Sequence, residues 1–119
     1  MKSYTDIEQS KKLADILPIE SADGYWDFQI DGYNLIADKL GYYKNDSEIP
    51  CWSLAALLGL MPTDDKKDEY YVVAESHSDY HTVSYRNCWD GCIHSEYSEE
   101  SLLDAAFEMI CWLKENGKI

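Results

Sequence analysis

The sequence predicts an α+β fold, with an antiparallel sheet of about five strands and about three helices packed mainly on one face of that sheet. Apolar residues recur at helical spacing in three segments, near 5–17, 50–62 and 98–116. Between these segments apolar and polar residues alternate, which is typical of half-buried strands. Two Asp-Gly dipeptides, at 31–32 and 90–91, interrupt the alternating runs and predict tight hairpins. A chain of 119 residues has the size of one domain, so residues 1–119 are expected to form a single α+β domain.

The first two helices are marked by their end signals. Thr5 is the candidate cap of the first, because Glu8 completes a capping-box pattern, and Pro18 closes that helix. The second helix begins near Pro50 or Ser53. Its expected apolar stripe, with the proline that ends it, consists of Leu54, Leu57, Leu58, Met61 and Pro62.

The C-terminal helix has the clearest pattern. Ser98 is the candidate cap, Lys114 lies near the negative end of the helix dipole, and Gly117 is expected just beyond the last turn. The expected buried stripe consists of Leu102, Leu103, Ala106, Met109, Ile110 and Leu113.

The strands are predicted from period-two alternation. Trp26, Phe28 and Ile30 are expected to face the core in the first strand of a hairpin that turns at Asp31-Gly32. Segment 41–50 is expected to be a polar connector and 63–69 a charged loop.

Three further strands, at 70–75, 80–89 and 92–96, are predicted to form a meander. The polar residues 76–79 form its first turn and Asp90-Gly91 the second.

Composition limits the classes of function. Twenty-three acidic residues against ten basic ones give a net charge of −13, which disfavours direct binding to DNA, RNA or an anionic membrane surface. The acidic residues are spread along the chain, as on a solvated face, but they also suit a basic protein partner. The N-terminus is too polar for a signal peptide and no apolar run could span a membrane, so a cytoplasmic location with four reduced cysteines is expected.

All three histidines and two cysteines fall between residues 75 and 94. A two-residue turn at Asp90-Gly91 would pair Trp89 with Cys92 and Cys88 with Ile93, and would direct the two thiols to opposite faces of the sheet. We therefore expect these histidines and cysteines to have a structural role, and predict no metal and no cofactor. If a metal site exists, its ligands are His81, Cys92 and His94, which that register places on one face. No phosphate-binding glycine loop or nucleophile motif occurs.

Two segments resemble a known group of proteins. One is "PCWSLAALLGLMP", from Pro50 to Pro62, and the other is "DAAFEMICWLKEN", from Asp104 to Asn116. Both are similar to segments of small bacterial proteins that occur with prophages and mobile elements. The resemblance implies a bacterial cytoplasm and a phage-derived gene. It implies no activity, cofactor or catalytic residue.

Two classes of function follow as hypotheses. The first is a small non-enzymatic protein-binding module, possible partners being basic proteins, with candidate contact residues Trp26, Trp52, Tyr80 and Trp89. For each of these residues the alternative is burial in the core. The second is a small metal-dependent or cysteine-based enzyme centred on His81, Cys92 and His94. A homodimer formed through a sheet edge or an aromatic patch is compatible with the sequence.

Overall fold

A computed structural model describes residues 3–29, 32–36, 48–62, 70–87 and 89–119 of the chain. Residues 41–47 of the polar connector predicted at 41–50, the charged loop at 63–69, and residues Ile30, Asp31 and Cys88 lie outside the described residues. The rest of that connector, residues 48–50, is part of a strand and not a connector. The contacts between residues divide the chain into two compact units, Lys2–Ala56 and Leu57–Ile119, and each is described by itself.

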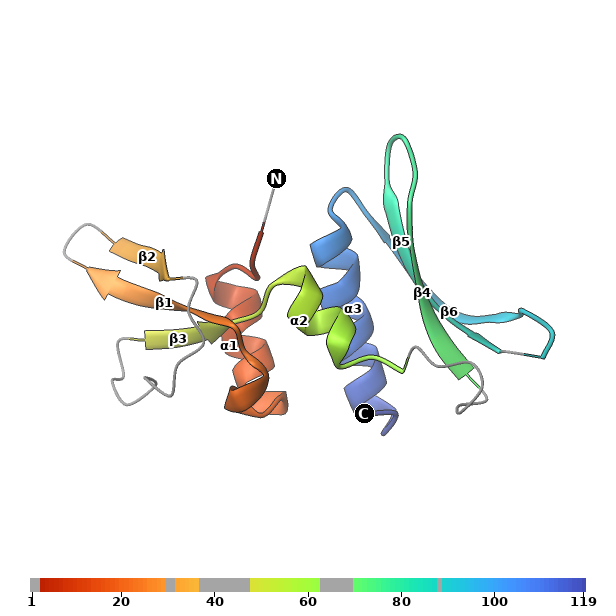
Figure 1. The fold of residues 1–119 in the computed structure, drawn as a ribbon, viewed down its shortest axis with the longest axis horizontal. Helices are drawn as coiled ribbons and strands as arrows, with labels where there is room; N and C mark the ends of the chain where they lie inside the picture. Colours follow the sequence, from red (N-terminus) through yellow and green to blue (C-terminus); the bar gives the residue numbers. More distant parts are fainter. Residues whose placement is uncertain (1–2, 30–31, 37–47, 63–69, 88) are drawn as a thin grey trace. The chain divides into compact units, whose positions relative to one another are not determined.

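The described residues confirm an α+β fold but not one sheet of five strands. They form three α-helices and two antiparallel sheets of three strands each (Figure 1). None of the helices in the described part of the chain is long and apolar enough to cross a membrane.

In the N-terminal unit, helix α1 (Ile7–Ile16) begins one residue later than the sequence predicts. Asp6 is its N-cap and forms a capping box with Gln9, with distances of 2.8 and 3.0 Å. Thr5 is buried instead, and its hydroxyl group lies 2.8 Å from that of Ser10. The helix stops at Leu17 before Pro18, as predicted, and a short 3-10 helix, Ile19–Ser21, follows.

The sheet of this unit has the order β2-β1-β3, made of β1 (Gly24–Gln29), β2 (Gly32–Ile36) and β3 (Glu48–Cys51). The first hairpin is confirmed, but its turn lies one residue earlier than predicted, because Gln29 pairs directly with Gly32. Strand β3, which α1 contacts, was not predicted. Pro50 lies in it at the sheet edge, where a proline removes no hydrogen bond from a ladder.

Helix α2 (Leu54–Gly59) carries the chain from one unit into the next. Ser53 begins it, as one of the two predicted starts, and its hydroxyl group accepts a hydrogen bond from the Ala56 N–H at 3.2 Å. Leu57 and Met61 of the predicted stripe are buried.

The C-terminal unit contains the predicted meander, with β4 (Tyr70–Ser76), β5 (His81–Asn87) and β6 (Ile93–Glu99) in the order β4-β5-β6. Helix α3 (Leu102–Glu115) contacts all three strands (Figure 1). The face of the sheet toward α3 includes Tyr85, whose ring centroid lies 5.3 Å from that of Trp112.

Helix α3 begins later than predicted and ends where predicted. Ser101, not Ser98, is its N-cap, because Ser98 and Glu99 belong to β6. At the other end Gly117 has a φ of 67°, and the Lys118 N–H donates to the Leu113 carbonyl at 2.8 Å. These are the features of a Schellman motif, in which glycine takes the left-handed conformation without a Cβ penalty. Of the predicted stripe, all members but Leu102 are buried.

Candidate functional site

The turn between β5 and β6 is a four-residue loop, not the two-residue turn that the sequence predicts. The Asn87 N–H donates to the Cys92 carbonyl at 3.0 Å, and the Gly91 N–H donates to the Asn87 carbonyl at 3.0 Å. The Asn87 side chain accepts from the Trp89 N–H at 2.8 Å, and the Asp90 side chain accepts from the Cys92 N–H at 2.9 Å. These bonds restrain the backbone of Trp89, Gly91 and Cys92.

The prediction failed because Asp90 does not take the positive φ that a type I′ turn requires. In the described chain only glycines have a positive φ, and Gly91, at 72°, is one of them. The Asn87 side chain offers the loop N–H groups an alternative acceptor, which favours the wider turn.

The wider loop changes the register of the hairpin. Arg86 pairs with Ile93 and Tyr85 with Ser95, so His94 is the additional residue of a β-bulge. The predicted pairing of Trp89 with Cys92 is therefore wrong, because Trp89 lies in the loop.

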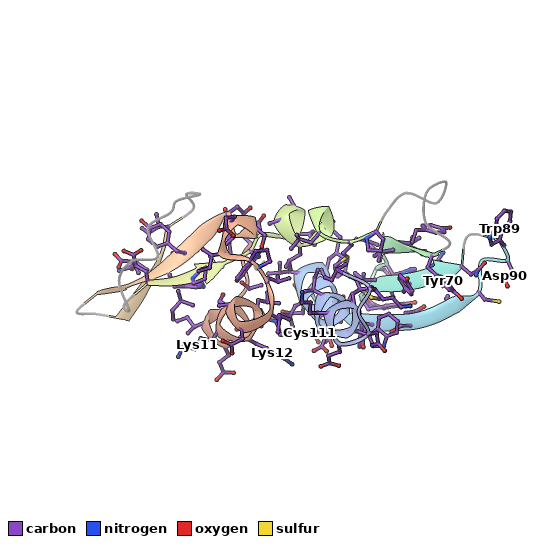
Figure 2. All side chains as sticks on the ribbon, turned by 90° about the horizontal axis from the view of Figure 1, so that it is seen from below. Lys11, Lys12, Tyr70, Trp89, Asp90 and Cys111 are labelled. Carbon is purple, nitrogen blue, oxygen red and sulfur yellow. The ribbon has the colours of Figure 1, made fainter. Side chains whose placement is uncertain are left out.

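Trp89 stands at the outer end of this hairpin, with Asp90 beside it (Figure 2). The tryptophan is 84% exposed and Ile93, at the base of the loop, is 51% exposed. Backbone hydrogen bonds fix the loop while the indole remains in water. A tryptophan that buries its ring on binding removes a large apolar area from water, so this arrangement suits an anchor residue.

The same region is strongly acidic. From residue 87 to residue 113 the chain has no lysine or arginine but six carboxylates. Four of these lie on the loop, on β6 and just after it, and are exposed: Asp90, Glu96, Glu99 and Glu100. The neighbouring Arg86 is engaged elsewhere, because its guanidinium group binds the Glu75 carboxylate and its Nε donates to the Ser84 hydroxyl group at 2.9 Å.

The four predicted aromatic contact residues lie in different local environments. Trp52 is completely buried and its indole N–H donates to the Ser21 hydroxyl group at 2.9 Å. Trp26 is partly buried and donates to the Thr5 carbonyl at 2.9 Å. Both belong to the other unit.

Tyr80 is exposed and lies in the β4–β5 turn, where its ring stacks on that of His77 with centroids 4.5 Å apart. The length of β5 separates Tyr80 from Trp89, about 23 Å for seven residues of strand. Trp89 is thus far more exposed than Tyr80, which is 46% exposed, and than the buried Trp52.

The alternative site at His81, Cys92 and His94 is not assembled in one place. His81 pairs with Glu99 at the far end of β6, and its Nδ1 lies 3.0 Å from the Ser76 hydroxyl group. Cys92 lies at the loop, about 20 Å of strand away. His94 is the bulge residue of β6. Within the described ranges no three His, Cys, Asp or Glu side chains are grouped closely enough to hold a metal ion.

Two of the described cysteines have thiols with a raised pKa. A hydrogen bond to the Asp90 side chain, and the charge of that carboxylate, raise the pKa of the exposed Cys92 thiol. Burial, followed by the charge of Asp23, raises the pKa of Cys51 to about 12. Cys111 is buried in α3. Each raised pKa lowers the thiolate fraction at neutral pH, and the thiolate is the reactive form.

Ile93 and the carboxylates around it were not predicted as site residues. A signal for them was present, since the acidic residues are spread over the whole chain but the basic residues are missing from 87–113. The exposure of Ile93 could not be read from the sequence, because it depends on the register of the bulged hairpin.

No protein-family model matches the chain, and no curated protein and no solved structure is significantly similar to it.

Proposed function

We propose that this chain is a small, acidic, non-enzymatic protein-binding module that contacts its partner through the β5–β6 hairpin. The observation that carries the proposal is Trp89, exposed over 84% of its surface on a loop held by backbone hydrogen bonds. A fixed loop loses little conformational entropy on binding, so more of the free energy of burying the indole remains as affinity.

The charge around the hairpin specifies the kind of partner. Asp90 beside the indole and the glutamates of β6 favour a partner with an apolar pocket surrounded by lysine or arginine. If the gene is phage-derived, as the resemblance implies, the partner is a basic host or phage protein whose activity the chain modulates.

The proposal is tested by comparing Trp89→Ala with Tyr80→Ala as baits in a lysate of the organism that encodes the chain. Both residues are exposed aromatics at hairpin turns, so the second variant is a matched control. We expect a bound protein that the wild type and Tyr80→Ala retain equally. Trp89→Ala should recover it at least about thirtyfold less, because loss of an anchor residue costs about 2 kcal/mol or more. The readout is quantitative mass spectrometry of the recovered proteins.

The exposed indole makes few contacts within the chain, so Trp89→Ala should have the melting temperature of the wild type. Equal recovery of every bound protein by the two variants would contradict the proposal.

A further inference from the structure

Strand β6 is an edge of its sheet, and its backbone groups alternate in direction. In β5 the Asn87 N–H points toward β6, because it donates to Cys92. Alternate residues of a strand bond to the same neighbour, so Tyr85, Val83 and His81 also bond toward β6. Their partners Ser95, Tyr97 and Glu99 use their backbone groups on β5. The N–H and C=O groups of Glu96 and Ser98 consequently point outward.

This outward side is accessible. Glu96 and Ser98 are both exposed, and among the described strands none pairs with β6 on that side. The opposite edge of the sheet differs, because the Val72 N–H of β4 already donates to the Pro62 carbonyl at 2.7 Å. Of the two edges, β6 is thus the one on which the outward backbone groups of two alternate residues, Glu96 and Ser98, have no described partner.

The side chains along β6 select the charge of an added strand. Glu96 lies on the face that carries Ser84, away from α3, while Glu99 ends the strand and Glu100 follows it. If a second copy of the chain paired its β6 with this strand, the glutamates of the two copies would lie close together. Like charges on neighbouring strands repel. Acidic residues and a bulge are devices that prevent pairing between copies. A basic strand would instead meet carboxylates that have no lysine or arginine nearby in sequence.

We infer that β6 binds an extended, basic segment of the protein partner by strand addition, with Trp89 as the apolar anchor at one end. The segment pairs with the outward groups of Glu96 and Ser98, and its lysine or arginine side chains face the glutamates. About 10 Å of strand separates Glu96 from Ile93 at the base of the Trp89 loop, so one segment reaches both. The inference rests on the proposed function and specifies how the same hairpin recognises its partner.

The probe is a synthetic peptide of about nine residues that alternates lysine with valine, long enough to cover β6. The measurement is amide hydrogen exchange, residue by residue, by NMR at saturating peptide. We expect hydrogen exchange of the Glu96 and Ser98 amides to slow by about tenfold, because the outward N–H of each gains a hydrogen bond to the added strand. The amide of Ala74, on the β4 edge, is the internal control and should not change.

Two variants test the mechanism. Ser98→Pro removes an outward N–H without removing a hydrogen bond to β5. It should abolish the slowed exchange of the Glu96 amide on addition of the peptide. Glu96→Gln keeps the backbone and should weaken peptide binding by about threefold, whereas Glu115→Gln, an exposed charge at the end of α3, should not. If Ser98→Pro does not fold, a peptide with a central proline tests the same bond on the wild-type chain.

The outcomes separate the two proposals. Chemical shift changes without slowed exchange at Glu96 and Ser98 would mean attraction by charge alone and would overturn strand addition. Equal binding of a peptide with glutamate in place of lysine would overturn the charge selection. If either occurs while Trp89→Ala still loses its partner, the proposed function stands and only the binding mode is wrong. Failure of both experiments would reject both.

Discussion

Gly24 is a residue whose missing side chain makes room for close packing. A Cβ atom at this position would lie 2.9 Å from Cε1 of Tyr4, and 3.1 Å from both the Cys51 Sγ and the Ile36 carbonyl oxygen. A backbone oxygen cannot rotate away, so we expect Gly24→Ala to lower the free energy of unfolding by about 1–3 kcal/mol in urea denaturation. Gly59, in α2, has no atom within 4 Å of such a Cβ and is the control. There alanine should be neutral or slightly stabilising, and equal stability of the two variants would refute the argument.

The tryptophans show what single residues could and could not reveal in the sequence. Three of the four follow a cysteine, at Trp52, Trp89 and Trp112. The first is completely buried, the second is largely exposed, and the third is partly buried against Tyr85. The same dipeptide thus occurs in three environments. Trp89 was among the candidates, but only the register of its hairpin could distinguish it from Trp52.

At the scale of elements, the start of α3 gives a direct test. The Ser101 hydroxyl group accepts a hydrogen bond from the Asp104 N–H at 3.4 Å, whereas Ser98 lies in β6. We expect Ser101→Ala to lower the free energy of unfolding by about 1 kcal/mol, because an N-cap bond is lost. Ser98→Ala should change it by much less. Thermal unfolding followed by circular dichroism measures both, and the reverse order would place the cap at Ser98.

The helices and the meander were largely predictable, because amphipathic spacing, proline stops and Gly117 are local signals. Strand β3 was not, since its four residues contain Pro50 and form a strand only by pairing with β1. The turn at Asp90-Gly91 was located correctly but given the wrong length, because its shape depends on side-chain acceptors at Asn87 and Asp90. Local sequence thus predicts which segments are strands better than it predicts their register.

At the scale of the whole molecule, the excess of acidic over basic side chains makes the side chains repel one another on balance. Residues 1–56 carry ten acidic and five basic side chains, a net charge of −5, and residues 57–119 carry thirteen and five, a net charge of −8. Added salt screens this repulsion, so we expect the melting temperature to rise as sodium chloride is increased to about 0.3 M. Binding of the lysine-valine peptide should weaken over the same range. A melting temperature that falls with salt would instead indicate that attractive ion pairs prevail. Sodium sulfate at matched ionic strength is not a suitable control, because sulfate strengthens apolar burial.

The division into two three-stranded sheets is also a property of the whole molecule. Period-two alternation identifies a strand but carries no information on which strands share a sheet, so the hairpin and the meander were assigned to one sheet in error. The candidate site was predictable only in part for the same reason. Trp89 was named from its residue type, while the register of Ile93 and Glu96 against β5 is set by the bulge at His94.

The absence of lysine and arginine from residues 87–113 has a practical consequence for the laboratory. Trypsin, which cleaves after these residues, would release the loop, β6 and all of α3 except Glu115 as a single peptide from Asn87 to Lys114. Reagents that modify amines cannot attach anywhere in the hairpin loop or on β6. A chain immobilised through its lysines therefore keeps the surface around Trp89 chemically unmodified, and amine coupling is a suitable way to prepare it as a bait.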